Sequence, residues 1–161
     1  METYRVRVSK DYLSFCSAHF IVFHGSQCER LHGHNYRVAA ELEAELDDDS
    51  LVFDFIALKR ILRELTGELD HRLLVPVEAR KLAVEVGDDE VTITYRDKRW
   101  LAPRGDCALL PIANTTAELL ARYFADRLAS TIAEQFPTRL ARMVIEVEES
   151  PGQCAFYERV Y

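Results

Sequence analysis

Four of the five histidines lie within one short stretch, between residues 19 and 34. His32 and His34 are two residues apart at the start of a predicted strand, so both side chains project from one face and can converge on one ion. His19 lies on the preceding strand, which antiparallel pairing can bring alongside. Three neutral imidazoles with one position left open form the ligand set of a catalytic zinc site. The alternative, surface or hydrogen-bonded core histidines, is less favoured for this pattern.

Cys28 lies four residues before His32, in a loop that also holds His24, Glu29 and Arg30. Three roles are open for it: an inert thiol, a fourth zinc ligand, or an activated nucleophile or base. A thiolate near zinc and a histidine has a lowered pKa and can take up a proton, whereas direct coordination would close the metal site. We favour the base, although spacing alone does not decide between the three.

The dipeptide Asp70-His71 follows a predicted helix. An aspartate beside a histidine can orient the imidazole and stabilise its charged form, as in catalytic triads. A histidine at a helix end also commonly serves only to satisfy the last carbonyls and the helix dipole. The pair is therefore a weak signal on its own.

Glu149 falls on the strand face that also carries Met143, Ile145 and Val147. A carboxylate on an apolar face needs a partner. Either it reaches solvent, because the chain turns immediately afterwards at residues 151–152, or it accepts two N–H groups from a ligand. The amino-pyrimidinone edge of a pterin or guanine offers such adjacent donors.

Hydrophobic periodicity predicts the elements that position these residues. Strands are expected over residues 4–9, 15–20, 34–46, 141–149 and 155–161. A helix capped by Asp54 should run from Phe55 to Leu69, and a second should open at Thr115 with Glu118 completing a capping box. A hairpin is expected between them, from 82–86 and 91–95. This order favours an α+β fold with both helices on one face of an antiparallel sheet.

Composition limits the class of protein. A chain of 161 residues with 48% hydrophobic content fits a single domain spanning 1–161. A net charge of -7 argues against broad nucleic-acid or anionic-membrane binding. No stretch approaches the roughly 20 apolar residues that cross a bilayer, and four scattered cysteines suit reduced thiols. We therefore expect a cytoplasmic protein without nucleic-acid or membrane partners.

Several short strings, in this order and spacing, resemble the 6-pyruvoyltetrahydropterin synthase superfamily. They are FCSAHF, CERLHGHNYRV, VFDFIALK, LDHRLL, TTAE and VEES, and together they span nearly the whole chain except residues 77–112. Carried over by position, the resemblance implies a zinc site and a proton-transfer set. The implied zinc ligands are His19, His32 and His34, and the implied catalytic residues are Cys28, Asp70 and His71.

The resemblance also implies a substrate pocket. Glu149 matches the glutamate that anchors the pterin, and Thr116 and Glu118 occupy a segment that lines the pocket in relatives. Ala117 stands where many relatives carry a hydroxyl residue, and Glu118 has the alternative role of a helix cap. The family further implies a tunnelling fold: a four-stranded antiparallel sheet with two helices, assembled as homo-oligomeric trimers or hexamers with active sites between subunits. The segment near 77–112 is then an inserted hairpin.

Spacing within this superfamily points to a reaction. Three residues separate Cys28 from His32, which resembles the carboxy-forming enzymes of queuosine biosynthesis, whereas pyruvoyl-forming enzymes typically place five there. The expected reaction converts 7,8-dihydroneopterin triphosphate to 6-carboxy-5,6,7,8-tetrahydropterin, acetaldehyde and triphosphate. The basic residues considered for the triphosphate are Arg30, Arg37 and Lys59.

Three alternatives stay open. Two are enzymatic: a 6-pyruvoyltetrahydropterin synthase, and an aldolase-like relative that cleaves dihydroneopterin to a hydroxymethylpterin. The third is a zinc-stabilised binding module in which Cys28 is the fourth ligand, although closed structural sites favour more sulfur.

Overall fold

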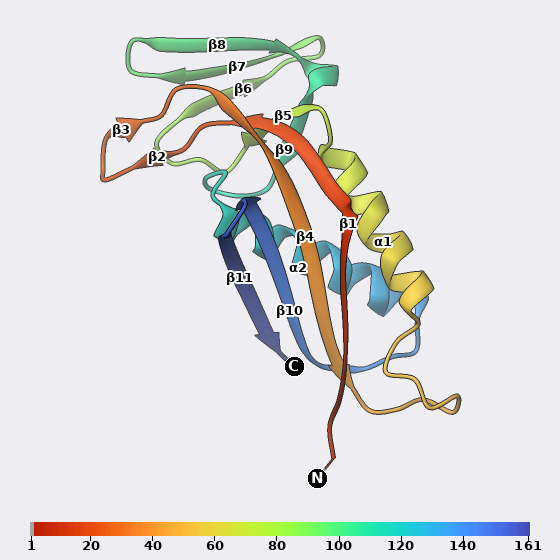
Figure 1. Cartoon of the computed structure of the whole chain (residues 1–161). Coiled ribbons are helices and arrows are strands. Elements are labelled where there is room, and N and C mark those ends of the chain that lie inside the picture. Colours follow the sequence, from red (N-terminus) through yellow and green to blue (C-terminus); the bar gives the residue numbers. More distant parts are fainter. Residues whose placement is uncertain (1) are drawn as a thin grey trace.

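A computed structural model describes residues 2–161 and arranges them around one strongly curved sheet (Figure 1). The strands are β1 (Tyr4–His19), β2 (Val22–Phe23), β3 (Gln27–Cys28), β4 (His32–Ala44), β5 (Arg72–Pro76), β6 (Ala83–Val86), β7 (Glu90–Tyr95), β8 (Lys98–Pro103), β9 (Cys107–Leu110), β10 (Leu140–Ser150) and β11 (Gln153–Val160). The helices are α1 (Phe55–Leu69) and α2 (Ala117–Gln135), with a 3-10 turn η1 (Arg104–Asp106).

The main sheet has six strands in the order β11-β10-β4-β1-β5-β9. The first four pair antiparallel, as the sequence predicts, but β5 pairs parallel with β1 and β9 parallel with β5. The expectation of a four-stranded antiparallel sheet is therefore corrected to a six-stranded mixed sheet. The segment Arg72–Pro76 has no alternating pattern because Leu74 and Val75 are both buried, as is typical of strands covered on both faces.

A register shift in β1 decides which side chains face the helices. Val8 is buried before the shift between Ser9 and Ser14, whereas Phe15 and His19 are buried after it. An unbroken strand would keep even-numbered residues on the inner face, since side chains alternate with a period of two. The irregularity therefore turns His19 inward, onto the same face as the alternating apolar residues of β4.

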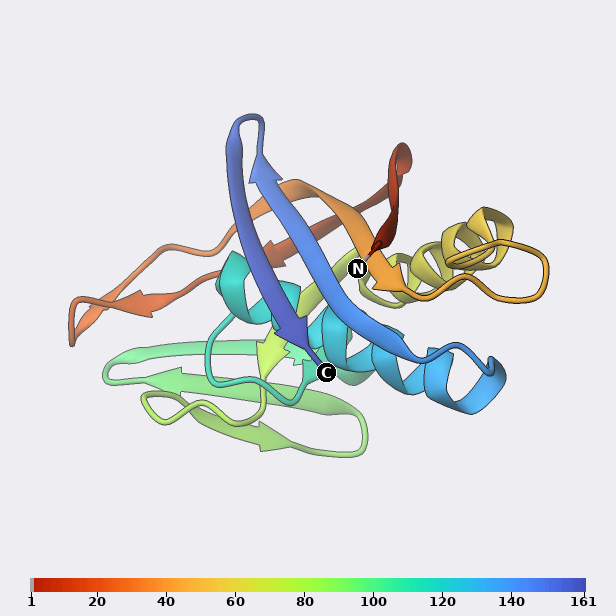
Figure 2. The same cartoon turned by 90° about the horizontal axis from the view of Figure 1, so that it is seen from below.

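Both helices cover the same concave face of the sheet (Figures 1 and 2). The helix α1 has the predicted bounds, and Asp54 caps it by accepting a hydrogen bond from the Ile56 amide at 2.8 Å. The helix α2 begins one residue later than predicted, because Thr116 is its N-cap and accepts from the Leu119 amide. The predicted capping box of Thr115 and Glu118 is therefore wrong. Within residues 2–161, neither helix combines the length and apolar character needed to span a bilayer.

The predicted hairpin is part of a separate three-stranded sheet, β6-β7-β8. The strand β8 was not predicted from the sequence; it pairs antiparallel with β7 from Tyr95↔Lys98 to Glu90↔Pro103. One face of this sheet packs on a second apolar cluster, distinct from the core under the helices, that includes Phe20, Val22 and Val75. Residues 83–103 thus form a small folded layer with its own core.

Candidate active site

The three predicted histidine ligands come together on the inner face of the sheet. His19 ends β1 and lies opposite His32 in the β1–β4 register, and His34 follows two residues along β4. Each residue offers a ring nitrogen, and these atoms lie within 4.8 Å of one another. The ring centroids are 4.8 to 5.2 Å apart. This cluster can hold a metal ion.

The backbone fixes the orientation of two of these rings. His19 Nδ1 lies 2.9 Å from the Thr115 carbonyl oxygen, and His32 Nδ1 lies 2.8 Å from the Arg30 carbonyl oxygen. A carbonyl can only accept, so Nδ1 carries the proton in both rings and each Nε2 keeps a lone pair for a metal. Burial lowers the pKa of His19, which keeps this ring neutral. The donor set therefore fits a divalent metal.

Thr115 is a supporting residue that sequence reasoning missed. Its carbonyl orients His19, and its buried hydroxyl donates a hydrogen bond to the Phe20 carbonyl at 3.0 Å. These two contacts join the start of α2 to the end of β1. The threonine pair preceding α2 was the available signal, but it predicted only a helix cap.

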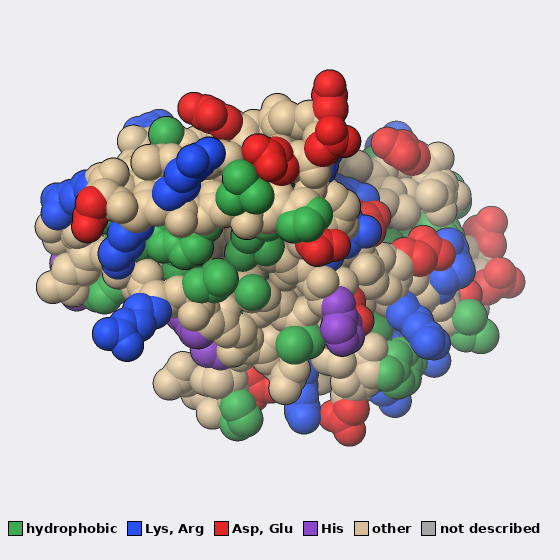
Figure 3. Space-filling model, turned by 90° about the horizontal axis from the view of Figure 1, so that it is seen from above, with side chains coloured by type: hydrophobic (Ala, Val, Ile, Leu, Met, Phe, Trp, Pro, Cys, Tyr) green, Lys and Arg blue, Asp and Glu red, His purple; other side chains and the backbone are tan. Residues whose placement is uncertain are grey.

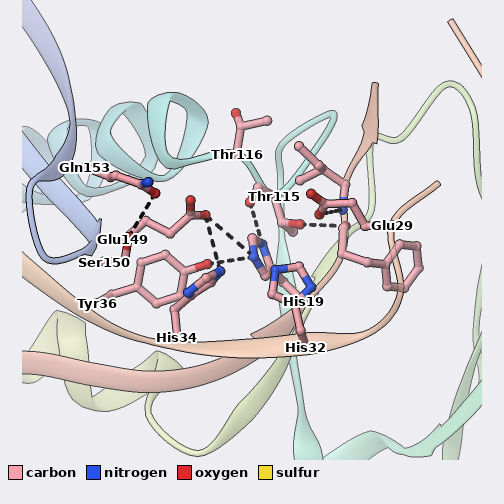
Figure 4. Close-up of polar contacts among 12 residues, drawn as sticks. His19, Glu29, His32, His34, Tyr36, Thr115, Thr116, Glu149, Ser150 and Gln153 are labelled. Atoms are coloured by element: carbon pink, nitrogen blue, oxygen red, sulfur yellow. Dashed lines mark hydrogen bonds and ion pairs between the residues drawn. The ribbon is translucent and has the colours of Figure 1, made fainter. Parts of the chain in front are cut away.

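Two further side chains complete the cluster (Figure 4). The Tyr36 hydroxyl lies 3.1 Å from His19 Nε2, and Glu149 Oε1 lies 3.6 Å from His19 Nε2 and 4.0 Å from His34 Nε2. Burial, reinforced by the Glu149 carboxylate, raises the pKa of Tyr36, so the phenol stays protonated and can donate. The alternation His32, His34, Tyr36 places Tyr36 on this face, although the sequence predicted for it only a place in the strand over residues 34–46.

An open cavity of about 350 Å³ is lined by the three predicted substrate residues, Thr116, Glu118 and Glu149, and Glu149 connects it to the histidine cluster. Its other walls are Ile21, Ala117, Gln153, Cys154 and Ala155. The volume is within the range of small-molecule sites, roughly 300 to 1,000 Å³. A register irregularity between Glu148 and Ser150 lies at the rim, where β10 turns into β11. The cavity therefore joins β10, β11 and the start of α2.

Cys28 lies on the short β2–β3 hairpin that leads into β4. It is half-buried, and its Sγ lies 3.5 Å from the Glu29 carbonyl oxygen. Burial raises the pKa of this thiol, while the Lys98 ammonium acts in the opposite direction. In the single chain, desolvation of the thiolate therefore outweighs the nearby cation.

Glu29, which the sequence analysis placed in the loop without a role, closes the base of this hairpin. Its side-chain Oε2 accepts from the Ile21 amide at 3.1 Å, and its own amide donates to the Ile21 carbonyl at 3.1 Å. Glu29 thus follows Cys28 in sequence, and its carboxylate is held by the Ile21 amide (Figure 4).

Asp70 and His71 form the close pair that the sequence predicts. Asp70 also contacts Cys16 on β1, and in the part of the chain that the structure describes the pair makes no polar contact with the histidine cluster. Asp70 Oδ2 lies 2.9 Å from His71 Nδ1, while Oδ1 accepts from the Cys16 amide at 2.7 Å. The Cys16 hydrogen bond, with His71 adding to it, lowers the pKa of Asp70. The His71 side chain is 82% exposed. Within residues 2–161, no hydrogen bond or ion pair joins this pair to the histidine cluster.

Comparisons with known proteins agree with this geometry. Residues 7–160 match the family model for 6-pyruvoyl tetrahydropterin synthase. A Methanocaldococcus jannaschii protein, assigned provisionally as a 6-carboxy-5,6,7,8-tetrahydropterin synthase, is 36% identical over 148 residues, which cover 91% of this chain and 90% of the relative. A Pyrococcus horikoshii protein with the same provisional assignment is 37% identical over 143 residues, covering 88% and 83%.

Solved structures give the same result. The 6-pyruvoyl tetrahydropterin synthase of Plasmodium vivax is 32% identical, has a TM-score of 0.91 and is covered over 100% of both chains. Another P. vivax structure of that enzyme, 29% identical with a TM-score of 0.87 and 100% coverage of both chains, is a variant in which a glutamate named as a catalytic residue is replaced by alanine.

Proposed function

The chain belongs to the 6-pyruvoyl tetrahydropterin synthase family of lyases, which act on pterins, and from this premise we propose a specific reaction for it. The proposed reaction converts 7,8-dihydroneopterin triphosphate to 6-carboxy-5,6,7,8-tetrahydropterin, acetaldehyde and triphosphate, as in queuosine biosynthesis. The relatives assigned as 6-carboxy-5,6,7,8-tetrahydropterin synthases and the three-residue spacing between Cys28 and His32 support this product.

The single observation that carries the proposal is the arrangement of the three histidines beside the cavity. His19 and His32 present Nε2 lone pairs, and a ring nitrogen of His34 lies within 4.8 Å of the ring nitrogens of the other two. The cavity is lined by Glu149, which contacts His19 and His34. Zinc held there would supply Lewis acidity that stabilises the negative charge developing on the substrate side chain. A set of three histidine ligands with no cysteine ligand is typical of a catalytic zinc site.

The chain's own residues would then divide the remaining tasks. Glu149 would bind the adjacent N–H groups of the pterin with its two carboxylate oxygens. Cys28 would accept a proton from a side-chain carbon of the substrate as a thiolate. Asp70 holds His71 through the 2.9 Å contact and would stabilise the imidazolium when His71 carries a proton.

We propose that the complete site forms between copies of the chain in a homo-oligomer, a trimer or hexamer. Asp70 and His71 pair beside Cys16, which is exposed on β1, whereas His19 of the same strand is buried on the helix side. One chain therefore does not bring Asp70 and His71 together with its metal ligands. The edge strand β11 also carries exposed apolar residues, Phe156 and Val160, which suits pairing with another copy.

Among the basic residues considered for the triphosphate, Arg30 has the best position. It precedes β4 and its carbonyl holds His32, so its exposed side chain starts next to the metal cluster. Arg37 lies on the opposite face of β4 from the histidines and pairs with Asp11 and Glu148. Figure 3 shows Lys and Arg side chains at the end at which Figure 1 places the β2–β3 hairpin, and others at the opposite end, where more Asp and Glu side chains accompany them.

A second reaction, the aldolase-like cleavage of dihydroneopterin to a hydroxymethylpterin, is favoured by one observation. Glu29 supplies a carboxylate on the residue that follows Cys28, at the base of the hairpin that leads into the strand of His32 and His34. The P. vivax relative has a glutamate named as a catalytic residue. A carboxylate base at Glu29 would serve this cleavage, and Glu29→Gln would then remove hydroxymethylpterin formation while leaving the carboxy product.

Metal reconstitution tests the proposed zinc role. The purified protein is stripped with a chelator, reloaded with zinc, and assayed with dihydroneopterin triphosphate before and after loading. The proposal expects turnover to disappear with the metal and return with zinc. Full turnover by the stripped protein would contradict it. The binding-module alternative instead predicts that the chain loses its fold on stripping and has no turnover when loaded.

A further inference from the structure

The inserted sheet β6-β7-β8 contacts the hairpin that carries Cys28. In Figure 1 the turn between β7 and β8 lies at the same end of the molecule as the β2–β3 hairpin. Two hydrogen bonds join them: the Tyr95 hydroxyl donates to the Ser26 carbonyl at 2.6 Å, and the Lys98 ammonium donates to the Cys28 carbonyl at 3.3 Å. Tyr95 and Lys98 are directly paired across the ladder.

Strand alternation explains why these two side chains reach the hairpin. Residues paired directly across an antiparallel ladder point to the same face, and that face recurs every second residue. Tyr95 and Lys98 therefore share a face with Ile93 and Trp100, which belong to the second apolar cluster. Arg99 points the other way and is exposed.

The same face also holds the chain segment immediately before the hairpin. The Trp100 ring stacks on Phe20 with centroids 4.2 Å apart and an interplanar angle of 24°. Val22 is buried in this cluster, and Cys28 packs against it. The inserted sheet thus contacts the hairpin at its entry, its turn and its exit.

The hairpin has little structure of its own to hold Cys28. Its ladder consists of two residue pairs, Val22↔Cys28 and Phe23↔Gln27, and its turn contains His24 and Gly25 at positive φ. Even a complete two-stranded hairpin is marginally stable alone in water. Contacts from outside must therefore fix the thiol, and a displacement of about 1 Å from a reacting group can reduce turnover roughly 100-fold.

We propose that the sheet β6-β7-β8 is a positioning element for Cys28, in which Tyr95 and Lys98 hold the hairpin backbone at Ser26 in the turn and at Cys28 itself. The inference rests on the proposed function of Cys28 as the base. It assigns a role to residues 83–103, which lie in the segment that carries none of the short sequence strings shared with the superfamily. The Lys98 ammonium also favours the thiolate form of Cys28 electrostatically, which reinforces the geometric role.

Four point variants test the proposal, each in the zinc-loaded protein. Tyr95→Phe and Lys98→Met remove the two donors, Lys98→Arg keeps a cationic donor, and Arg99→Met is the control on the opposite face. The measurements are zinc content, thermal unfolding, kcat and KM with dihydroneopterin triphosphate, and amide hydrogen exchange of residues 22–28 by mass spectrometry.

The expected result is a fall in kcat of roughly two- to tenfold in Tyr95→Phe and in Lys98→Met, the size of one lost hydrogen bond. KM, zinc content and the unfolding midpoint should stay at wild-type values, exchange of residues 22–28 should accelerate, and Lys98→Arg should retain more turnover than Lys98→Met. Arg99→Met should match the wild type.

Wild-type kcat and wild-type exchange in Tyr95→Phe and Lys98→Met would overturn the inference. A Cys28→Ser variant separates this failure from failure of the proposed function. Full turnover in Cys28→Ser would overturn the assignment of Cys28 as the base. The contacts of Tyr95 and Lys98 with the hairpin would then have no catalytic consequence. Loss of turnover in Cys28→Ser, with unchanged Tyr95→Phe and Lys98→Met, would overturn the positioning role alone.

Discussion

Replacing Glu149 with alanine should weaken pterin binding while leaving the metal in place. The carboxylate lines the cavity and its side chain is 27% exposed, so a bound pterin would bury it further. Its loss would leave two N–H donors of the ligand buried and unpaired. Two charged hydrogen bonds at a partly exposed group correspond to about 2 to 4 kcal/mol, roughly 30- to 1,000-fold in dissociation constant.

The assay is a calorimetric titration of the zinc-loaded variant with a dihydropterin, together with zinc analysis. Glu148→Ala is the matched control, because Glu148 is the preceding residue on β10 and its carboxylate pairs with Arg37 on the opposite face. The control should bind pterin normally. Normal pterin affinity in a folded, zinc-loaded Glu149→Ala protein would refute the anchoring role. Loss of zinc from that variant would show instead that the carboxylate, 3.6 Å from His19 Nε2, is a metal ligand.

His32→Ala should abolish stoichiometric zinc, because it removes one of the three ligands. Cys28→Ala should retain zinc with a large loss of turnover, because the metal needs an open coordination position and the thiol acts as a base. Metal analysis of both variants decides, and zinc loss from Cys28→Ala would favour the structural-site alternative. The free energy of unfolding of the metal-free protein should fall as pH drops below about 6.5, since His19 protonates there when unfolded but has a lowered pKa when folded. Urea titrations across pH 5 to 8 measure this slope, and a His19→Asn variant with the same slope would exclude His19 as its source. The inactive variants Cys28→Ser and His71→Ala can be unfolded together and refolded into mixed oligomers. These oligomers should recover part of the turnover if the site forms between copies. No recovery in a mixed oligomer would place the whole site within one chain.

The sequence predicted the elements whose periodicity is local. The alternation along β4 and the helical stripe of α1 follow from neighbouring residues alone, and the structure confirms both, with α1 at the predicted bounds. The convergence of His32 and His34 on one face follows from the same alternation. The strands β5 and β9 were missed because a short, doubly buried parallel strand has no alternation and finds its partner far along the chain.

The remaining misses concern contacts between distant segments. His19 was predicted correctly as a member of the cluster, but its inward position depends on the irregularity between Ser9 and Ser14, which falls in the gap between the strands expected over 4–9 and 15–20. Thr115 looks like a helix cap in sequence, but its hydroxyl is engaged by Phe20 and the cap passes to Thr116. The strand β8 was missed because Arg96 turns the chain at positive φ, a conformation that favours glycine. Asp70 and His71 pair as expected, yet their distance from the histidines depends on topology.

The central proposal is the conversion of dihydroneopterin triphosphate to a carboxypterin, and product identification tests it most directly. The purified, zinc-loaded chain is incubated with 7,8-dihydroneopterin triphosphate, and the pterin, the aldehyde and the released phosphate species are identified by chromatography and mass spectrometry. The account predicts 6-carboxy-5,6,7,8-tetrahydropterin with equal amounts of acetaldehyde and triphosphate. A 6-pyruvoyl product, or a hydroxymethylpterin as the sole product, would contradict it.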